Sequence, residues 1–223
     1  MRHLKVIRWI VWKDLLCEIR NREHIASMLF FALNVVLVFS FSFSMSDLRE
    51  VMPGIIWTTF GFTAVIGLGK AFLPEAQNDC IEFYQMLPGP KGVIYCGKLL
   101  GNALFLFLVE LALVPLLVLF LNLEFPPNGL LFVPILALGT IGLAALGTLF
   151  SALTVQVRAR EVLFPLLLLP LSVPVFIGAI EATRGLLDGS PFSFYRRWIE
   201  LLTVFDLIFT VVSFWVFEFI LDG

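Results

Sequence analysis

Residues 70–98 read KAFLPEAQNDCIEFYQMLPGPKGVIYCGK, a polar stretch between two long apolar runs. The pattern predicts a short amphipathic helix that faces water, at about residues 74–86, followed by a turn. The acidic residues of this segment are Glu75, Asp79 and Glu82. A membrane protein that exposes such a segment is usually bound there by a soluble partner, and that is our hypothesis for residues 74–97.

The chain as a whole is too apolar for a soluble domain. Of its 223 residues, 60% are hydrophobic and only 14% are charged, and the mean hydropathy is +0.98. Soluble domains average about 45–50% apolar and about 25% charged residues. We therefore expect an integral membrane protein. The net charge of −2 gives no support for a nucleic-acid partner.

Six apolar runs are each long enough to cross a bilayer core, which needs about 20 helical residues. The spans are helical, because an open strand cannot satisfy its backbone hydrogen bonds in lipid. We expect them at about residues 25–45, 53–73, 99–123, 129–157, 162–182 and 201–221. The predicted fold is thus one all-α transmembrane domain over residues 1–223.

Residues 1–24 combine basic residues with apolar ones at helical spacing, from Leu4 to Ile19. This pattern predicts an interfacial helix that lies on the membrane before the first span. A simple basic tail is the alternative. If the N-terminus is cytoplasmic, eleven of the fifteen Lys and Arg residues lie on the cytoplasmic side, so both termini and residues 74–97 are expected there.

Two spans have unusual compositions. The fourth is rich in small residues between 139 and 152, which suits either tight packing within the chain or a protomer interface. The fifth carries Pro165, Pro170 and Pro174, each of which removes an intrahelical hydrogen bond. We expect that helix to be kinked and to face protein or a water-filled cavity. Whether the kinked helix moves during function or is static stays open.

Charged residues inside spans require a reason. Glu110 lies near the middle of the third span, and Asn34 at similar depth in the first span is its candidate partner. Asp206 lies in the outer half of the sixth span. For Glu110, a place in a substrate path and a structural interhelical hydrogen bond both stay open. Asp206 is more readily explained as structural.

Residues 183–200 interleave aromatic residues with arginine, which predicts a short segment on the outer membrane interface. At the opposite surface, residues 92–98 have the spacing of a phosphate-binding loop up to Lys98, but Leu99 replaces the required Ser or Thr. No catalytic triad, HExxH motif or CxxC pair is present, and the cysteines match no metal-ligand spacing. We therefore expect no enzyme, no metal site and no ATP binding by this chain.

Three short motifs occur in order along the chain. Pro53-Gly54-Ile55-Ile56-Trp57 opens the second span, where Trp57 is expected to anchor the outer interface. The second motif lies in the inner segment, where Asp79–Glu82 is followed by Met86-Leu87-Pro88 and then by Lys98. The third motif is Leu169–Pro174 in the fifth span, which reads LPLSVP. Together these motifs resemble the haem exporter protein B (CcmB) family, and the six-span plan resembles an ABC-2-type (type V) exporter permease.

The resemblance implies a permease subunit of a bacterial inner membrane that works with a separate ATP-hydrolysing subunit. Its implied partners are a haem-handling membrane protein, a small single-span protein and a periplasmic haem chaperone of cytochrome c maturation. Haem is a possible substrate, and no cofactor is assigned to this chain. The residues implied in ATPase coupling are Glu75, Asp79, Glu82, Met86, Leu87 and Pro88, and those implied in translocation or gating are Glu110, Pro165, Pro170, Pro174 and Asp206.

Two other classes stay open. An ABC-2 permease for a lipid, glycan or drug would share the architecture but not the three motifs. A secondary transporter or an assembly factor would need no ATPase, but inverted repeats and paired charges in mid-membrane would then be expected.

Overall fold

The computed structural model describes residues 2–43, 45–78, 80–86, 90–121 and 129–222, and it leaves the side chains of residues 2, 45–49, 82, 85, 221 and 222 undescribed. The described chain is helical and contains no strand, which confirms the predicted all-α class. The helices are α1 (Arg2–Arg20), α2 (Arg22–Ser42), α3 (Met45–Leu68), α4 (Leu73–Gln77), α5 (Cys80–Met86), α6 (Gly92–Leu121), the 3₁₀ turn η1 (Gly129–Leu131), α7 (Phe132–Thr154), α8 (Arg160–Leu187) and α9 (Phe192–Asp222).

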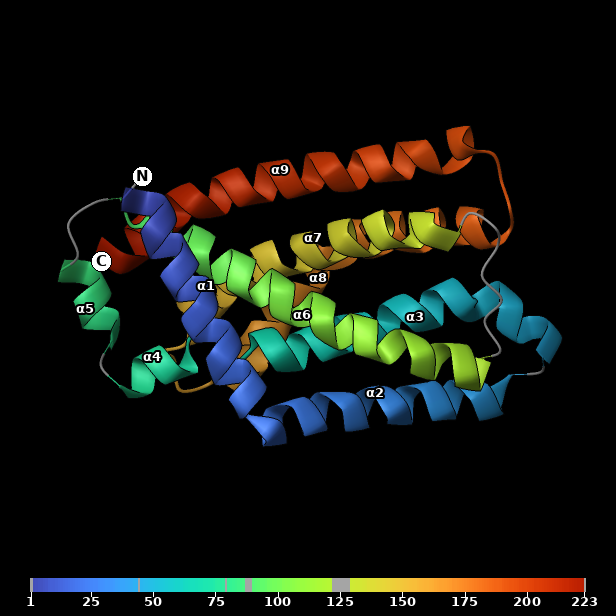
Figure 1. Cartoon of the computed structure of the whole chain (residues 1–223), viewed down its shortest axis with the longest axis horizontal. Helices are drawn as coiled ribbons and strands as arrows, with labels where there is room; N and C mark the ends of the chain where they lie inside the picture. The colour runs from blue at the N-terminus through green and yellow to red at the C-terminus, as the bar shows by residue number, and fades with distance from the viewer. Residues whose placement is uncertain (1, 44, 79, 87–89, 122–128, 223) are drawn as a thin grey trace.

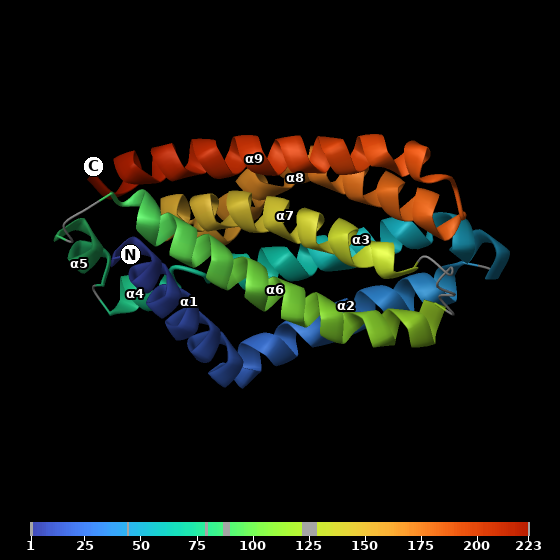
Figure 2. The same ribbon diagram turned by 45° about the horizontal axis from the view of Figure 1, so that its top comes forward.

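Within the described residues, six segments are long and apolar enough to cross a membrane, as the sequence predicts. They are α2, α3 with its extension into α4, α6, η1 with α7, α8 and α9. In Figures 1 and 2 these helices run alongside one another along the long axis of the molecule. Helix α1 instead crosses α6 obliquely at one end of the bundle (Figure 1). Both termini, α4 and α5 lie at that same end, which we call the α1 end.

Helix α7 lies deep in the bundle, since every residue from Gly142 to Ser151 is buried. Its glycines leave room for side chains from the neighbouring helices α3 and α9. The ring of Trp57 occupies the space beside Gly139, Asp206 the space beside Gly142, and Leu68 the space beside Gly147. The small residues of this span therefore serve close packing within the chain, which decides between the two readings of the sequence.

The structure corrects the expected position of Trp57. This side chain does not lie at an interface but is fully buried, and its Nε1 donates a hydrogen bond of 2.9 Å to Thr183 Oγ1 on α8. The bond satisfies the indole N–H, so the ring can be buried between α3, α7 and α8. Helix α3 also begins earlier than expected, so Pro53 lies inside it and not at its first turn.

The expected separate segment at residues 183–200 is also corrected. Helix α8 continues to Leu187, and residues 192–200 are the first turns of α9. The connection between them is short because Gly189 adopts a φ of +66°, which reverses the chain. The backbone N–H of Ser190 then donates to Gly185 O at 2.9 Å and closes the end of α8.

We predict that Gly139→Ala destabilises the protein by about 1–3 kcal/mol, the usual effect of overpacking a core. A Cβ at this position would lie 2.2 Å from Trp57 Cη2. The matched control is Gly54→Ala, because a Cβ there meets nothing within 4 Å. The measurement is the unfolding midpoint of the purified chain in detergent, and equal midpoints for the two variants would contradict the packing described here.

Candidate functional site

Four charged side chains from three helices meet at the α1 end of the bundle. We call them the charge cluster: Lys13 and Asp14 on α1, Glu75 on α4, and Lys98 on α6. The side chain of Lys98 is only 2% exposed and that of Glu75 only 3% exposed. Two positive and two negative charges offset each other, which is the condition for burying charged groups in a protein.

Lys98 makes the largest number of contacts in the charge cluster. Its Nζ donates to Glu75 Oε1 at 2.6 Å, to Asp14 Oδ1 at 3.2 Å and to Ala71 O at 3.0 Å. These three bonds use all three hydrogens of the ammonium group. Lys98 therefore connects α6 to α1, to α4 and to the turn that precedes α4. Its Nζ also lies 4.8 Å from the centre of the Phe72 ring, within the range of a cation–π interaction.

Lys13 closes the charge cluster on its outer side. Its ammonium group is ion-paired with Asp14 at 2.9 Å and hydrogen-bonded to Glu75, while its side chain stays 45% exposed. Burial opposes the charge of Lys13, but the carboxylates of Glu75 and Asp14 outweigh burial and raise its pKa above the usual value. Lys13 is therefore positively charged at physiological pH.

The close approach of α1 to α6 places Asp14 beside Lys98. A Cβ at Gly97 would lie 2.9 Å from Ile10 Cβ, and a Cβ at Gly101 would lie 3.3 Å from Asp14 Cβ. These two glycines are four residues apart, so they form one smooth face of α6 over which α1 crosses. Residues 92–98 are part of helix α6, so the lysine that resembled the last residue of a phosphate-binding loop is a buried structural cation.

The structure changes what the polar segment presents to a partner. Glu75, expected to face water, has its described ion pairs with Lys13 and Lys98 of the same chain. Asp79, Leu87 and Pro88 lie outside the described residues, as does the Glu82 side chain. The large described side chains that α5 exposes are apolar: Phe83 is 60% exposed and Met86 is 79% exposed.

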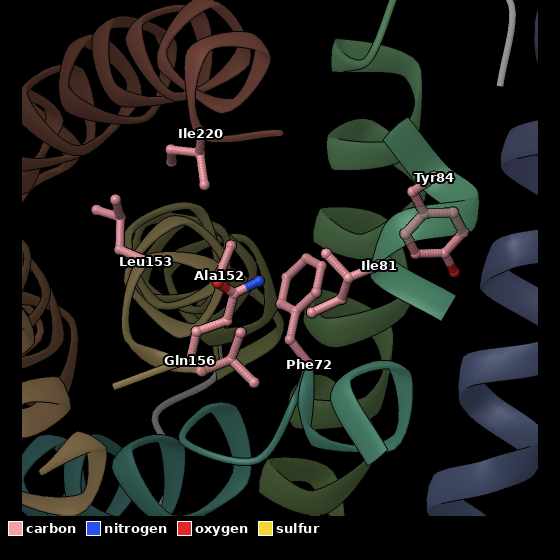
Figure 3. A pocket seen from close by; sticks show the side chains of 8 residues that line it. Phe72, Ile81, Tyr84, Ala152, Leu153, Gln156 and Ile220 are labelled. Atoms are coloured by element: carbon pink, nitrogen blue, oxygen red, sulfur yellow. The ribbon is translucent and has the colours of Figure 1, made fainter. Parts of the chain in front are cut away.

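A groove of about 140 Å³ separates α5 from the ends of α7 and α9 (Figure 3). In Figure 3, Ile81 and Phe72 face Ala152 and Gln156 across this space. Burial, followed by the nearby charge of Glu75, raises the pKa of Tyr84 to about 12, so its hydroxyl is neutral at physiological pH. Lys91 Nζ donates to the carbonyl of Tyr84 at 3.0 Å and holds α5 near the start of α6.

The two carboxyl groups in the middle of the bundle are not brought together. Glu110 accepts a hydrogen bond from Thr140 on one side of α7, whereas Asp206 lies against Gly142 on another. Neither oxygen of Asp206 has a hydrogen-bond partner among the described residues. Asn34, the expected partner of Glu110, is instead exposed on α2 and donates to Phe30 O, so that expectation is wrong.

The prolines of α8 differ in their surroundings. Pro170 and Pro174 are exposed on the outside of the bundle, and Pro165 is half-buried. The expectation that this stretch faces protein or a cavity is therefore not met within the chain at Pro170 and Pro174. A role of Glu110, Asp206 and the three prolines in translocation or gating stays a prediction.

His24 has a structural role in this arrangement. Its Nδ1 lies 2.9 Å from Glu18 Oε2 and its Nε2 lies 3.2 Å from Ile66 O, which ties the α1–α2 junction to α3. No group of three or more potential metal-ligating side chains occurs in the part of the chain that the structure describes.

Sequence reasoning missed Lys13, Asp14, Gly97 and Gly101. A signal for them was present, because Asp14 follows Ile10 by four residues and thus shares the face of α1 that otherwise carries apolar residues. The spacing Gly97-x-x-x-Gly101 around a lysine was the matching signal on α6.

Comparison with known proteins gives consistent matches. A family model described as "CcmB protein" matches residues 5–219. The chain is 29% identical over 193 residues to "Heme exporter protein B" of Pseudomonas aeruginosa, covering 86% of each chain. It is also 29% identical to the proteins of that name from Bradyrhizobium diazoefficiens, over 83% of each chain, and Escherichia coli K12, over 78% of this chain and 80% of the relative.

We predict that Lys98→Met destabilises the protein by about 3–5 kcal/mol, because it removes the buried cation and leaves two buried carboxylates with only the half-exposed Lys13 as their partner. Lys5→Met is the matched control, since Lys5 is an exposed lysine of α1. The free energy of unfolding in detergent measures both effects. A loss below about 1 kcal/mol in Lys98→Met would contradict the arrangement of the charge cluster.

Proposed function

The chain belongs to the CcmB protein family, and on that premise we propose that it is the membrane subunit of an ABC transporter for cytochrome c biogenesis. In this proposal a separate subunit hydrolyses ATP, and this chain couples that hydrolysis to haem export or to release of a haem-loaded periplasmic chaperone. The family match over residues 5–219 and the names of the similar proteins support the link to haem.

We place the α1 end of the bundle in the cytoplasm of a bacterial cell, with the protein in the inner membrane. The distribution of Lys and Arg along the sequence favours a cytoplasmic N-terminus. The structure brings the N-terminus, the C-terminus, α4 and α5 to one end, so a single orientation accounts for all of them (Figure 1).

The ATPase is proposed to bind α5 and the groove beneath it. Phe83 and Met86 are exposed at the α1 end, where the proposed orientation puts them in water, and exposed apolar side chains there suit a protein interface. The other partners in this proposal are a haem-handling membrane protein, a small single-span protein and the periplasmic chaperone.

The charge cluster is the main observation that supports the proposed coupling. Because Lys98 bonds to α1 and α4 at once, a displacement of α4 by the ATPase moves the start of α6 and the whole of α1 with it. Helix α6 then extends this displacement along the bundle, since it is one continuous helix of 30 residues. Rigid-body movement of packed helices is a common way to transmit such a signal.

An ABC-2 permease for another substrate, such as a lipid, glycan or drug, is the alternative function. It would keep the same architecture and the same ATPase contact. The names of the similar proteins favour haem over this alternative.

The proposed function predicts that the tagged protein, purified in mild detergent, recovers an ATPase together with haem-handling membrane proteins. It also predicts that deletion of the gene abolishes the formation of c-type cytochromes. Mass spectrometry and haem spectroscopy check the first result, and haem staining of membranes checks the second. Recovery of an ATPase from cells whose c-type cytochromes are unaffected by the deletion would favour the alternative.

The proposed ATPase contact predicts that Phe83→Asp lowers the recovered ATPase at least several-fold, because it places a charge in an apolar interface. Gln77→Asp is the matched control, since Gln77 is exposed at the end of neighbouring helix α4. Quantitative immunoblotting of the ATPase, normalised to the tagged chain, measures the effect. If both variants recover as much ATPase as the wild type, α5 is not the contact.

A further inference from the structure

A shallow groove of about 420 Å³ runs between α8 and α9, in the half of the bundle away from the termini. Its walls are apolar and consist of Pro174 on α8 with Leu201, Val204, Phe205 and Ile208 on α9. Arg197 and Glu200 line the end nearest the start of α9. Figure 2 shows α8 and α9 side by side over this length.

The two neighbouring arginines of α9 have different partners. Arg196 Nε donates to Glu200 Oε1 at 2.7 Å, so the one acidic residue that lines the groove is already paired. Arg197 instead stacks its guanidinium over the Phe194 ring at 5.5 Å and donates from Nε to Phe194 O at 3.4 Å. Among the described residues Arg197 has no carboxylate partner within salt-bridge distance. Its charge therefore remains available at the groove while its position is fixed.

The dimensions of the groove correspond to one leaflet of a bilayer. Arg197 and Ile208 are eleven residues apart, which is about 16 Å along a helix. Half of a bilayer core of about 30 Å is nearly the same length. An arginine at the headgroup level would thus have an apolar channel beneath it that ends near the middle of the membrane.

We propose that this groove binds an anionic phospholipid. The phosphate pairs with the guanidinium of Arg197, whose planar N–H groups suit phosphate oxygens, and one acyl chain lies along Leu201, Val204 and Ile208. The site lies away from the α1 end, so it neither includes the charge cluster nor depends on the proposed coupling to an ATPase.

The test is native mass spectrometry of the full-length chain in detergent with added phosphatidylglycerol, and with phosphatidylcholine as the zwitterionic comparison. We expect one phosphatidylglycerol to be retained preferentially. Arg197→Gln should weaken its binding roughly tenfold, the effect of losing one charged hydrogen-bonded contact. Arg184→Gln is the matched control and should bind as the wild type does, because Arg184 is paired with Glu181 and does not line the groove.

A second variant tests the groove without changing charge. Val204→Trp fills the apolar channel and should lower phosphatidylglycerol binding while Arg197 is intact, and an unchanged unfolding midpoint verifies that the helix is in place. Equal binding by wild type and Arg197→Gln would overturn the proposal. So would equal losses in the two arginine variants, equal retention of the two lipids, or full binding by Val204→Trp.

Discussion

The contact of Lys98 with the carboxylates of Glu75 and Asp14 is the constraint on which the α1 end of the molecule depends. A lysine with 2% of its side chain exposed requires opposite charges close by, because an unpaired buried ammonium group is very costly. Among the described residues those charges come from α1 and α4, so both helices must lie against the start of α6. Gly97 and Gly101 make this possible, since a Cβ at Gly97 would lie 2.9 Å from Ile10 Cβ and one at Gly101 would lie 3.3 Å from Asp14 Cβ.

In the part of the chain that the structure describes, the interior of the bundle is held together by close packing of side chains and not by ion pairs. Helix α7 carries no charged residue and packs through small ones, and large side chains of α3 fit beside its glycines. Trp57 shows how tight this packing is, because its ring fills the space of a missing Cβ and its N–H still reaches Thr183. The molecule thus joins a close-packed centre to an end held by charges, a division that suits the proposed transmission of movement from an ATPase.

The sequence predicted the architecture because long apolar runs report spans directly through their length and composition. It failed where a residue depends on neighbours distant in the chain. The sequence around Trp57 is typical of an interfacial anchor, but Gly139 and Thr183, which are distant in the chain, lie beside the ring and bury it. Likewise, Glu75 is in a polar segment, but Lys98 and Lys13 pair with it and bury it. Residues 192–200 carry the aromatic and arginine pattern of an interfacial segment, yet α9 continues through them without interruption.

The central claim is that the charge cluster makes α1, α4 and the start of α6 move as one unit. Pulsed electron paramagnetic resonance tests it in the assembled complex, after replacement of the free cysteines Cys17, Cys80 and Cys96. Spin labels at the exposed positions Arg8 and Gln77 report the α1–α4 distance, and labels at Gln77 and Phe219 report α4 against α9. We predict that ATP changes the 77–219 distance and leaves the 8–77 distance unchanged. A changed 8–77 distance, or a 77–219 distance that does not respond to ATP, would contradict the account.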